Sequence, residues 1–381
     1  MFGKEMLYRL NQLMNDSHPS GYFMDSFTSF SFLYEAAKDM QKELGSLHSS
    51  QAITMIPGQT NYALNPAYMG MYITDDYGDK VVKFYDGTAT SWLTWMDYSD
   101  IVYNNQTTWV RNPTSYGVID RTLASRISGT TTSSDAQIGG ESNLINSAAA
   151  LTFADVCPGD AVYNTTSNYT GIVLSKTNAT TLKTAMFDVS AVNSAYAGWT
   201  SGDAYIIQPQ PRYDLVVDPP PTGIELLTID ATPTPTTWAA GATLTGATSL
   251  KTCTVISKVT ATTYMVESRS GTFTDGEIIS DGTNSRDCGA GYPTFTGQQI
   301  ATVNYLQRPD PVYSDYGSYR FAAGYEEALL KYACWLYKYR DLNPNFGDTL
   351  YKVYDMQIRK AKNVQRRAVG AKGFRLNLQK R

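Results

Sequence analysis

The sequence predicts an α+β protein. Helices from the N- and C-terminal ends form a discontinuous helical bundle, with a central β layer between them and two small β modules, barrel- or sandwich-like, inserted into that layer. Three observations predict it. Helical periodicity is confined to the two ends of the chain. Short strand-like segments bounded by Gly, Pro and Asn turns fill the middle. One block of this β region recurs later in the same region.

Residues 1–50 predict two helices, because apolar side chains recur there every three or four positions. The His-Pro-Ser-Gly segment at 18–21 separates them. Ser29 or Ser31 is the predicted N-cap of the second helix. The predicted apolar stripes are Met6, Leu10 and Leu13 in the first helix and Leu33, Ala36, Met40, Leu44 and Leu47 in the second.

The central β domain is predicted from three separate parts of the chain, 51–130, 210–230 and 300–320. A Pro-Gly-Gln-Thr turn at 57–60 precedes its early strands, and a strand, a proline break and a second strand occupy 213–229. The two inserts between these parts are predicted to be β module 1 at 131–209 and β module 2 at 231–299. Insertions of this kind are tolerated at exposed loop tips.

An internal repeat supports the two modules. The segment 173–182, Val-Leu-Ser-Lys-Thr-Asn-Ala-Thr-Thr-Leu, matches 255–264, Val-Ile-Ser-Lys-Val-Thr-Ala-Thr-Thr-Tyr, at six of ten positions. A strand that follows a glycine precedes each copy, after Gly159 or Gly241. An aromatic-Thr-x-Gly turn follows each copy, at Trp199 or Phe273. Three blocks in the same order argue against chance similarity between Thr-rich strands.

The C-terminal part, 321–381, predicts two helices and a basic arm. In 322–340 apolar residues cover most of the helix surface, which is typical of a helix buried on several sides, partly by another subunit. Asn343-Pro344 predicts the start of the last helix, whose stripe is Leu350, Tyr354, Ile358, Ala361 and Ala368. The residues predicted to lie at a subunit interface are Tyr325, Tyr332, Trp335 and Tyr339.

The charge is strongly asymmetric. The last 23 residues, 359–381, hold nine Lys or Arg and no Asp or Glu, whereas the preceding 358 residues hold 22 basic and 35 acidic side chains. A cluster of like charge favours phosphate groups or an acidic protein surface as its partner. A dedicated nucleic-acid binder would carry a basic body as well. The alternative is a solvated tail.

Catalytic chemistry has little support in the sequence. The two histidines, His18 and His48, both lie in the N-terminal region, and no nucleophile elbow or nucleotide-binding glycine loop occurs. The aspartates at 75, 76 and 79 lack the spacing of a calcium loop. We therefore expect no enzyme activity, no cofactor and no metal. The sequence also predicts neither a signal peptide nor a membrane span.

The four cysteines, Cys157, Cys253, Cys288 and Cys334, are widely spaced and predict reduced thiols, with a Cys253–Cys288 bridge as an alternative. The tryptophans admit two interpretations as well. They could form a sugar-binding face, or they could be buried in the core or at subunit contacts, which we favour. The five concerned are Trp92, Trp95, Trp109, Trp199 and Trp238.

Several segments resemble head-to-tail adaptor (connector, or head completion) proteins of tailed bacteriophages. They are the helical start, Ile56-Pro-Gly-Gln-Thr-Asn-Tyr-Ala-Leu64, the 213–229 block, Tyr305-Leu-Gln-Arg-Pro-Asp-Pro-Val-Tyr313 and the segment 319–329 that leads into the last helices. The resemblance covers roughly 1–120, 211–230 and 300–381. The two inserts are absent from the minimal family pattern, which leaves the contacts on the tail side open.

The resemblance implies a structural virion protein of the neck, made in the host cytoplasm. It would form a homo-oligomeric ring, usually a dodecamer, under the portal protein. That ring would continue the channel for double-stranded DNA without sequence recognition and receive a tail or nozzle protein below. The implied portal-docking residues are Arg359, Lys360, Lys362, Arg366, Arg367, Lys372, Phe374, Arg375 and Leu376. The alternative function is a receptor- or carbohydrate-binding component of the tail or baseplate, favoured by the β modules and tryptophans.

Overall fold

The computed structural model describes residues 1–14, 25–56, 58–72, 81–87, 89–97, 112–121, 126–147, 153, 156–191, 194–230, 237–296, 299–322, 324–340 and 344–368, without the side chains of 339–340, 344–347 and 364–368. Within these residues the protein is α+β, with four α-helices and a majority of strands, as the sequence predicts. The chain divides into two compact units. Unit 1 comprises 1–48, 122–212 and 306–381, and unit 2 comprises 49–121 and 213–305.

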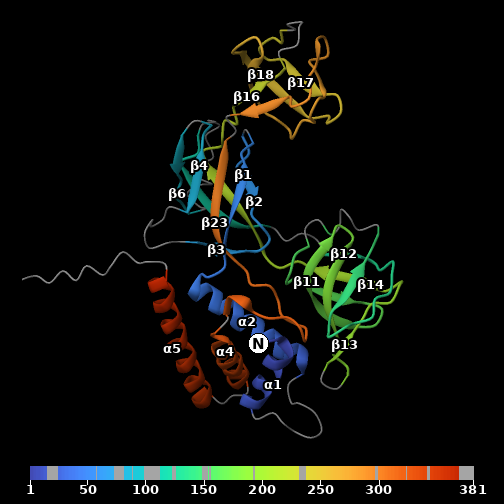
Figure 1. Cartoon of the computed structure of the whole chain (residues 1–381), viewed down its shortest axis with the longest axis vertical. Coiled ribbons are helices and arrows are strands. Elements are labelled where there is room, and N and C mark those ends of the chain that lie inside the picture. Colours follow the sequence, from blue (N-terminus) through green and yellow to red (C-terminus); the bar gives the residue numbers. More distant parts are fainter. Residues whose placement is uncertain are drawn as a thin grey trace, which may run out of the picture. The chain divides into compact units, whose positions relative to one another are not determined.

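The helices of unit 1 come from both ends of the chain. They are α1 (Gly3–Met14), α2 (Ser26–Leu44), α4 (Glu326–Arg340) and α5 (Pro344–Ala368), with a short 3-10 turn, η2, at Arg320–Ala322 before α4. Figure 1 shows the four side by side, with α4 in contact with each of the other three. Their apolar stripes share one core, to which the helices contribute the large, fully buried side chains Met6, Leu10, Phe30, Leu33 and Met40.

The start of α2 differs from the prediction. The helix begins at Ser26, and its N-cap is Asp25, whose carboxylate accepts hydrogen bonds from the backbone N–H of Thr28 at 2.8 Å and from its hydroxyl at 2.7 Å. The prediction of Ser29 or Ser31 as the cap was wrong, since Ser29 is buried one turn inside the helix. A carboxylate is also the better cap electrostatically, because the N-terminal end of a helix carries partial positive charge.

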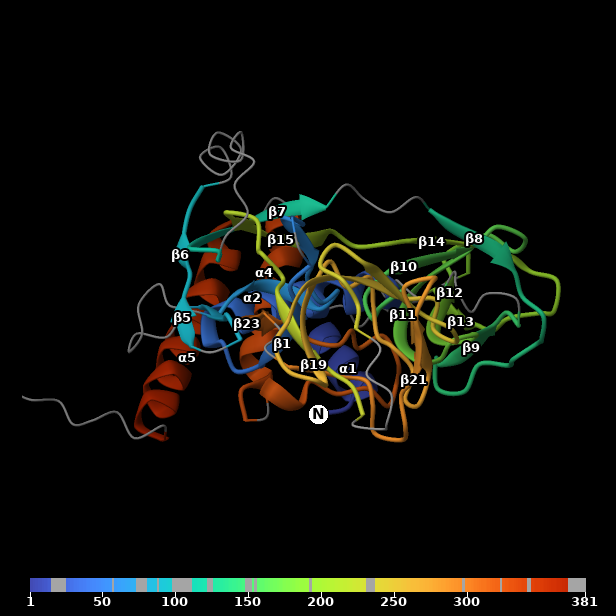
Figure 2. The same ribbon diagram turned by 90° about the horizontal axis from the view of Figure 1, so that it is seen from above.

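Module 1 is a seven-stranded antiparallel sheet within unit 1. Its main order is β13 (Ala195–Ala197), β12 (Thr181–Asp188), β11 (Tyr169–Asn178), β10 (Ala161–Asn164), β14 (Ala204–Gln208) and β8 (Ile127–Thr130), and β9 (Ser142–Ile145) also pairs with β12. Figure 2 shows these strands together in green. β8 lies before residue 131, where the sequence placed the start of the module.

The outer side of module 1 packs against the helices. Val173, Leu182 and Met186 point into the module's own core, whereas Ile172, Ala185 and Phe187 belong to the core of the helices. The Phe187 ring lies 5.3 Å from that of Phe27 and 6.4 Å from that of Phe30, both on α2, between ring centroids. Strands β11 and β12 are therefore buried on both faces, and module 1 is fixed to the helical part of unit 1.

Two sheets of unit 2 share a core. The first has the order β1 (His48–Thr54), β23 (Ile300–Gln307), β4 (Val82–Tyr85) and β5 (Thr90–Trp92), and β3 (Tyr68–Met71) also pairs with β23. The second has the order β2 (Asn61–Ala63), β15 (Arg212–Asp218), β7 (Ser115–Arg121) and β6 (Thr94–Trp95). The chain passes from the first sheet to the second at buried Leu93, and side chains of both sheets form one hydrophobic cluster.

Module 2 is the third sheet of unit 2. Its order is β21 (Ser285–Asp287), β20 (Ile278–Ser280), β17 (Thr243–Gly246), β18 (Thr252–Lys258), β19 (Thr263–Glu267), β16 (Glu225–Thr228) and β22 (Thr294–Thr296). β16 lies before residue 231, where the sequence placed the start of this module. The division of the chain into five predicted parts stays a prediction, but both sheets begin earlier than its boundaries.

The repeat predicted from sequence is confirmed by topology. The order β12-β11-β10-β14 in module 1 equals β19-β18-β17-β20 in module 2. Val173 pairs with Thr184 and Ser175 with Lys183, so Leu174 forms a bulge, and Val255 pairs with Val266 and Ser257 with Met265, so Ile256 forms the same bulge. Gly159 and Gly241, both at positive φ, donate the same hydrogen bond, to the carbonyl oxygens of Val173 and Val255 at 2.8 and 2.7 Å.

The two copies have different residues at one pair of equivalent positions. In module 1, Asn164 Oδ1 accepts from the N–H groups of Thr166 and Ser167 at 3.0 and 3.1 Å, and its Nδ2 donates to Asp203 at 2.8 Å. The Asn164 side chain therefore binds the backbone of the turn, and Asp203 fixes the position of the Asn164 side chain.

Module 2 closes the matching turn with a single residue. Gly246 takes the place of Asn164, and the longer Glu277 takes the place of Asp203. The Glu277 carboxylate reaches the matching turn directly and accepts from the N–H groups of Thr248 and Ser249 at 3.0 and 2.8 Å. A Cβ on Gly246 would lie 2.5 Å from both carboxylate oxygens, so the glycine makes room for the glutamate.

Candidate docking surface on the C-terminal helix

The last helix has a buried stripe and an exposed basic face. α5 begins at Pro344, as predicted; Leu350, Tyr354 and Ile358 are buried in the core of the helices, and Ala361 is buried as well. Because these residues recur every three or four positions, the side chains between them face away from the core. The predicted stripe is therefore confirmed as far as Ala361; the side chain of Ala368 lies outside the described residues.

The exposed face of α5 carries basic side chains around one apolar residue. Arg359 is 75 % exposed and forms an ion pair with Asp355, one turn earlier, at 2.8 Å. Met356 is 48 % exposed, and Lys352 and Lys360 are exposed beside it. Ion pairs at such exposure contribute little to stability. These side chains therefore contribute little to the stability of the fold.

The predicted docking residues fall into three groups. Arg359 and Lys360 lie on the exposed face, and Lys362 forms an ion pair with Glu43 of α2, which ties this turn of α5 to the body. Arg366 and Arg367 continue the helix, but their side chains are outside the described residues. The others, Lys372, Phe374, Arg375 and Leu376, lie wholly outside the described residues.

Two of the predicted interface aromatics meet within one chain. Tyr332 and Trp335 of α4 lie against Tyr351 and Tyr354 of α5, with ring centroids 4.8 Å apart for Tyr332 and Tyr354 and 4.9 Å apart for Trp335 and Tyr351. The Tyr354 hydroxyl donates to Asp39 of α2 at 2.6 Å. Burial and the Asp39 carboxylate raise the pKa of Tyr354 well above its usual range. These aromatics join α4, α5 and α2.

The subunit-interface role of these aromatics stays a prediction. Tyr325 is half-buried and packs against the helical core at the start of α4, while the side chain of Tyr339 lies outside the described residues. Burial accompanied by the Asp39 charge also raises the pKa of Tyr332 to about 12. Tyr332 and Tyr354 are therefore neutral at physiological pH and act as packing and hydrogen-bonding groups.

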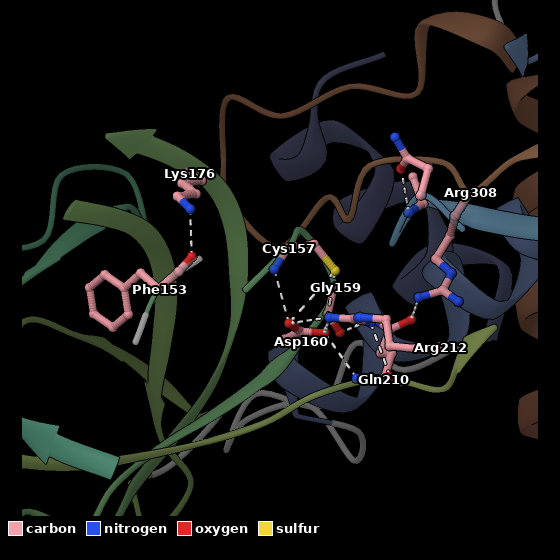
Figure 3. Close-up of polar contacts among 10 residues, drawn as sticks. Phe153, Cys157, Gly159, Asp160, Lys176, Gln210, Arg212 and Arg308 are labelled. Carbon is pink, nitrogen blue, oxygen red and sulfur yellow. Dashed lines mark hydrogen bonds and ion pairs between the residues drawn. The ribbon is translucent and has the colours of Figure 1, made fainter. Parts of the chain in front are cut away.

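A buried ionic centre lies where module 1 meets the helical part of unit 1 (Figure 3). The Asp160 carboxylate accepts from the Arg212 guanidinium at 2.8 and 3.0 Å and from the N–H groups of Cys157 and Gln210 at 3.0 and 2.9 Å. Arg308 donates to the Gln210 side chain. Asp160 and Arg212 are both almost fully buried, so each charge depends on the other for compensation.

This centre is structural rather than nucleophilic. Cys157 lies beside Asp160, and burial together with that negative charge raises the pKa of its thiol to about 12. A thiol is nucleophilic only as the thiolate, so Cys157 is inert at neutral pH. The sequence reasoning missed Asp160, although a signal existed: the repeat places Ala242 at the equivalent position, and a charge that replaces alanine at the start of a core strand needs a dedicated partner.

All four cysteines are free and buried. The bridge considered between Cys253 and Cys288 is not formed, and both thiols belong to the apolar core of module 2. Burial raises the pKa of Cys253 to about 12 and that of Cys288 to about 11. Of the tryptophans, Trp199 and Trp238 are core residues, whereas Trp92 and Trp95 are exposed and Trp109 is outside the described residues.

Within the described ranges, His, Cys, Asp and Glu side chains form no group that could hold a metal ion. In the same part of the chain, no helix is long and apolar enough to cross a membrane. No protein family matches the chain, and neither a curated protein nor a solved structure matches it at a significant level. The surface of α5 and the two repeat modules are therefore the features of the molecule from which a function can be inferred.

Proposed function

We propose that this chain is a head-to-tail adaptor of a tailed bacteriophage, a structural virion protein without enzyme activity. Copies of it form a ring, which we expect to be a dodecamer. The ring docks on the portal protein through α5 and the basic segment that follows, continues the channel for double-stranded DNA and attaches the tail or nozzle protein. In this proposal the terminal helices form a discontinuous bundle, and modules 1 and 2 are insertions into the central β layer. The protein acts in the neck of the virion.

The exposed basic face of α5 carries the proposal. The helix is anchored by its buried stripe and by the Tyr354–Asp39 hydrogen bond, while Lys352, Arg359 and Lys360 point outward. Every further charged residue of the sequence, from Arg366 to Arg381, is basic. An anchored helix that leads into an uninterrupted basic segment suits a partner groove lined with carboxylates.

Unit 2 adds support from the segments that resemble adaptors. The Tyr62 hydroxyl donates to the carbonyl oxygens of Ile56 and Gln59 and accepts from the N–H of Ile56, all at 2.9–3.0 Å. Strand β2 of this segment pairs with β15 of the 213–229 block, and Gly58 N–H donates to the carbonyl oxygen of Pro221 at 3.0 Å. Two segments that are far apart in sequence and carry the resemblance thus form one local structure.

Portal binding tests the proposal directly. The purified chain is mixed with the portal oligomer encoded in the same genome, and complexes are imaged by negative-stain electron microscopy. We expect a ring on the portal for the full chain and none for a chain truncated after Asn363. The absence of any complex with the full chain would refute the adaptor function.

A charge reversal separates the exposed face from the arm. Arg359→Glu with Lys360→Glu is expected to weaken portal binding at least tenfold, because the outward side chains would then repel an acidic groove. The matched control is Lys4→Glu with Lys83→Glu, which changes the net charge equally at exposed positions outside α5. Equal binding by both variants would assign docking to the arm alone.

A second function rests on the exposed Trp92 and Trp95 of unit 2. Aromatic side chains on a β surface suit carbohydrate, and a receptor-binding tail or baseplate component is the alternative. Binding of the full chain to a glycan array would favour this function if Trp95→Ala abolished it and Tyr8→Ala, which removes an exposed aromatic ring of α1, did not. This alternative leaves the basic face of α5 without a role.

A further inference from the structure

Arg308, the residue that follows β23, is a buried guanidinium without a carboxylate partner. It is 8 % exposed, and it donates one hydrogen bond, to the side-chain oxygen of Gln210 (Figure 3). Among the residues that the structure describes, no carboxylate lies within ion-pair distance of it, and the nearby Asp160 is bound to Arg212 at 2.8 Å instead. A buried charge is costly unless a partner compensates it.

The carboxylates around this centre do not supply that compensation. The oxygens of Asp160 are occupied by Arg212 and by two backbone N–H groups. Glu35 of α2 is 53 % exposed and forms its ion pair within its own helix, at 2.6 Å. Desolvation alone raises the pKa of Asp310, so the Arg308 charge does not act on that carboxyl. In the described part of the chain, the centre therefore holds two guanidinium groups and one carboxylate.

The hydroxyl of Tyr34 lies beside this excess charge. Tyr34 of α2 is 4 % exposed, and its hydroxyl is buried and forms no hydrogen bond of normal geometry with any described residue. Burial raises the pKa of Tyr34 to about 12, and Arg308 and the Gln210 amide oppose this rise, so both lie close to the hydroxyl. The hydroxyl is therefore neutral at physiological pH and is a donor without an acceptor.

Gly159 allows these groups to converge. A Cβ on Gly159 would lie against Gln210 Nε2 and 2.7 Å from the Tyr34 hydroxyl oxygen, so only glycine leaves them room. At Gly241, the equivalent glycine of module 2, a Cβ would meet no described atom within 4 Å. The arrangement is therefore specific to module 1, where α2 and the Gln210 side chain meet at this glycine.

The unused donors define the chemistry of a ligand. A water molecule satisfies the Tyr34 hydroxyl but does not compensate the Arg308 charge, whereas an anion does both. The planar guanidinium fork matches the two oxygens of a carboxylate. The remaining N–H groups of Arg308 are not sealed in the core, so a small ion can reach them. A side chain that is only 8 % exposed excludes a large polyanion such as nucleic acid.

We propose that Arg308 and Tyr34 form a binding site for a small free carboxylate ion where module 1 meets the helices of unit 1. The guanidinium binds the carboxylate oxygens, and the Tyr34 hydroxyl donates to one of them. The ion compensates the buried charge and connects α2 with the segment that follows β23, beside Gly159 of module 1. The site is independent of the proposed adaptor function, since it needs neither a ring nor a portal.

Saturation-transfer NMR of sodium formate with the full chain tests the site directly. We expect a formate signal with wild type, its loss in Arg308→Gln, and binding at least fivefold weaker in Tyr34→Phe. The matched control is Arg126→Gln, which should keep the signal. Arg126 also donates to a glutamine side chain, that of Gln208 at 3.2 Å, but it is exposed.

Hydrogen exchange separates binding from folding. Formate at ten times its dissociation constant should slow exchange in α2 and β10 about tenfold, because a ligand of the closed state multiplies protection by one plus its concentration over that constant. Peptides of module 2 are the internal control and should not respond. Without formate, Tyr34→Phe should exchange as wild type does, since it loses only an unpaired hydroxyl, and its response to formate should be reduced.

The source of the carboxylate is tested with N-acetylglutamate amide, which carries the carboxylate of a protein side chain. Binding of formate but not of this compound supports a free ion, whereas equal binding would assign the site to a side chain of another protein and overturn the proposal. It is overturned as well by the absence of a formate signal with wild type, or by an equal signal in Arg308→Gln or Tyr34→Phe. Faster exchange of Tyr34→Phe without formate would give the hydroxyl a partner in the fold, with the same consequence.

Discussion

Module 1 has Asn164 and Asp203 where module 2 has Gly246 and Glu277. A double-mutant cycle in module 2 tests whether the two residues of such a pair depend on each other. Glu277→Asp shortens the side chain by one methylene, so its carboxylate withdraws from the N–H groups of Thr248 and Ser249. A hydrogen bond to a charged group contributes about 1.5–3 kcal/mol, but water reaches this turn and replaces part of the loss. We expect Glu277→Asp to destabilise module 2 by about 2–3 kcal/mol.

The second mutation restores the arrangement of module 1. Gly246→Asn alone places a Cβ 2.5 Å from the Glu277 oxygens and from Ser249 Oγ, and overpacking of this kind costs about 1–3 kcal/mol. In the double mutant, the introduced asparagine should bind the turn as Asn164 does, and the shorter aspartate leaves room for it. The double mutant is expected to cost about 1 kcal/mol, a coupling of about 3 kcal/mol.

Hydrogen exchange measured by mass spectrometry on the full chain gives the local opening free energy of β17, β18 and β20. Peptides of module 1 serve as the internal control and should not change. A double mutant that is as unstable as the sum of the single mutants would refute the reasoning, because the two residues would then act independently.

The same carboxylate gives a pH dependence of known sign. Burial alone would raise the pKa of Glu277, but hydrogen bonds from Ser249, Thr274 and Thr248 outweigh it and lower the pKa from its usual value of 4.5. The stability contributed by Glu277 is therefore fully present above that value and is lost as the pH falls through the lower pKa of the folded state. The difference in local opening free energy between wild type and Glu277→Gln, measured by hydrogen exchange, should therefore become smaller as the pH falls below the folded-state pKa of Glu277.

Three further predictions concern unit 1 and the thiols. Asp160→Asn removes the carboxylate that the buried Arg212 guanidinium binds and should destabilise unit 1 by about 3–5 kcal/mol in urea unfolding, whereas Asp188→Asn, at a partly exposed position, should cost much less. Phe187→Ala opens a cavity between module 1 and α2 and should cost about 3–5 kcal/mol, with faster proteolysis of module 1 than of module 2. The four thiols should react with Ellman's reagent only after unfolding, and rapid reaction of the native chain would contradict their burial.

The repeat was predictable because its signal lies in short-range periodicity. Matching residues such as Val173 and Val255 face the cores, and in each copy strand pairing resumes at the Ser-Lys pair that follows the bulge. A slip by one residue would move the apolar set to the other face. The outward position of Arg359 and Lys360 was predictable for the same reason, since the stripe of Leu350, Tyr354 and Ile358 determines which side of α5 is buried.

Long-range polar pairs and the choice of helix cap were not predictable. Asp160 and Arg212 are 52 positions apart, and nothing local indicates that they meet. The N-terminal region offers Asp25, Ser26, Thr28, Ser29 and Ser31 as possible caps; the helix uses Asp25, and Ser29 is buried inside the helix. The sequence also could not show that Tyr332 and Trp335 meet aromatic residues of their own chain, because apolar periodicity does not distinguish an intrachain partner from a second subunit.

The outer faces of the two modules show that one fold can pack in two ways. Ile172 and Ala185 are paired across β11 and β12, and with Phe187 they bury that face of module 1 against the helices. The matching residues of module 2 are Thr254, Glu267 and Arg269, which are polar. The helices therefore cover this face of β11 and β12 in module 1, whereas the equivalent face of β18 and β19 in module 2 carries polar residues.

Module 2 closes this face by itself. Arg269 forms an ion pair with Glu225 of β16 at 2.7 Å, and its guanidinium lies 4.4 Å from the centre of the Phe295 ring. Module 1 packs its outer face against the helices, whereas the polar residues on the outer face of module 2 find their partners within the same sheet. Module 2 therefore needs no helix to cover this face, because one arginine, one glutamate and one aromatic ring of the same sheet satisfy it.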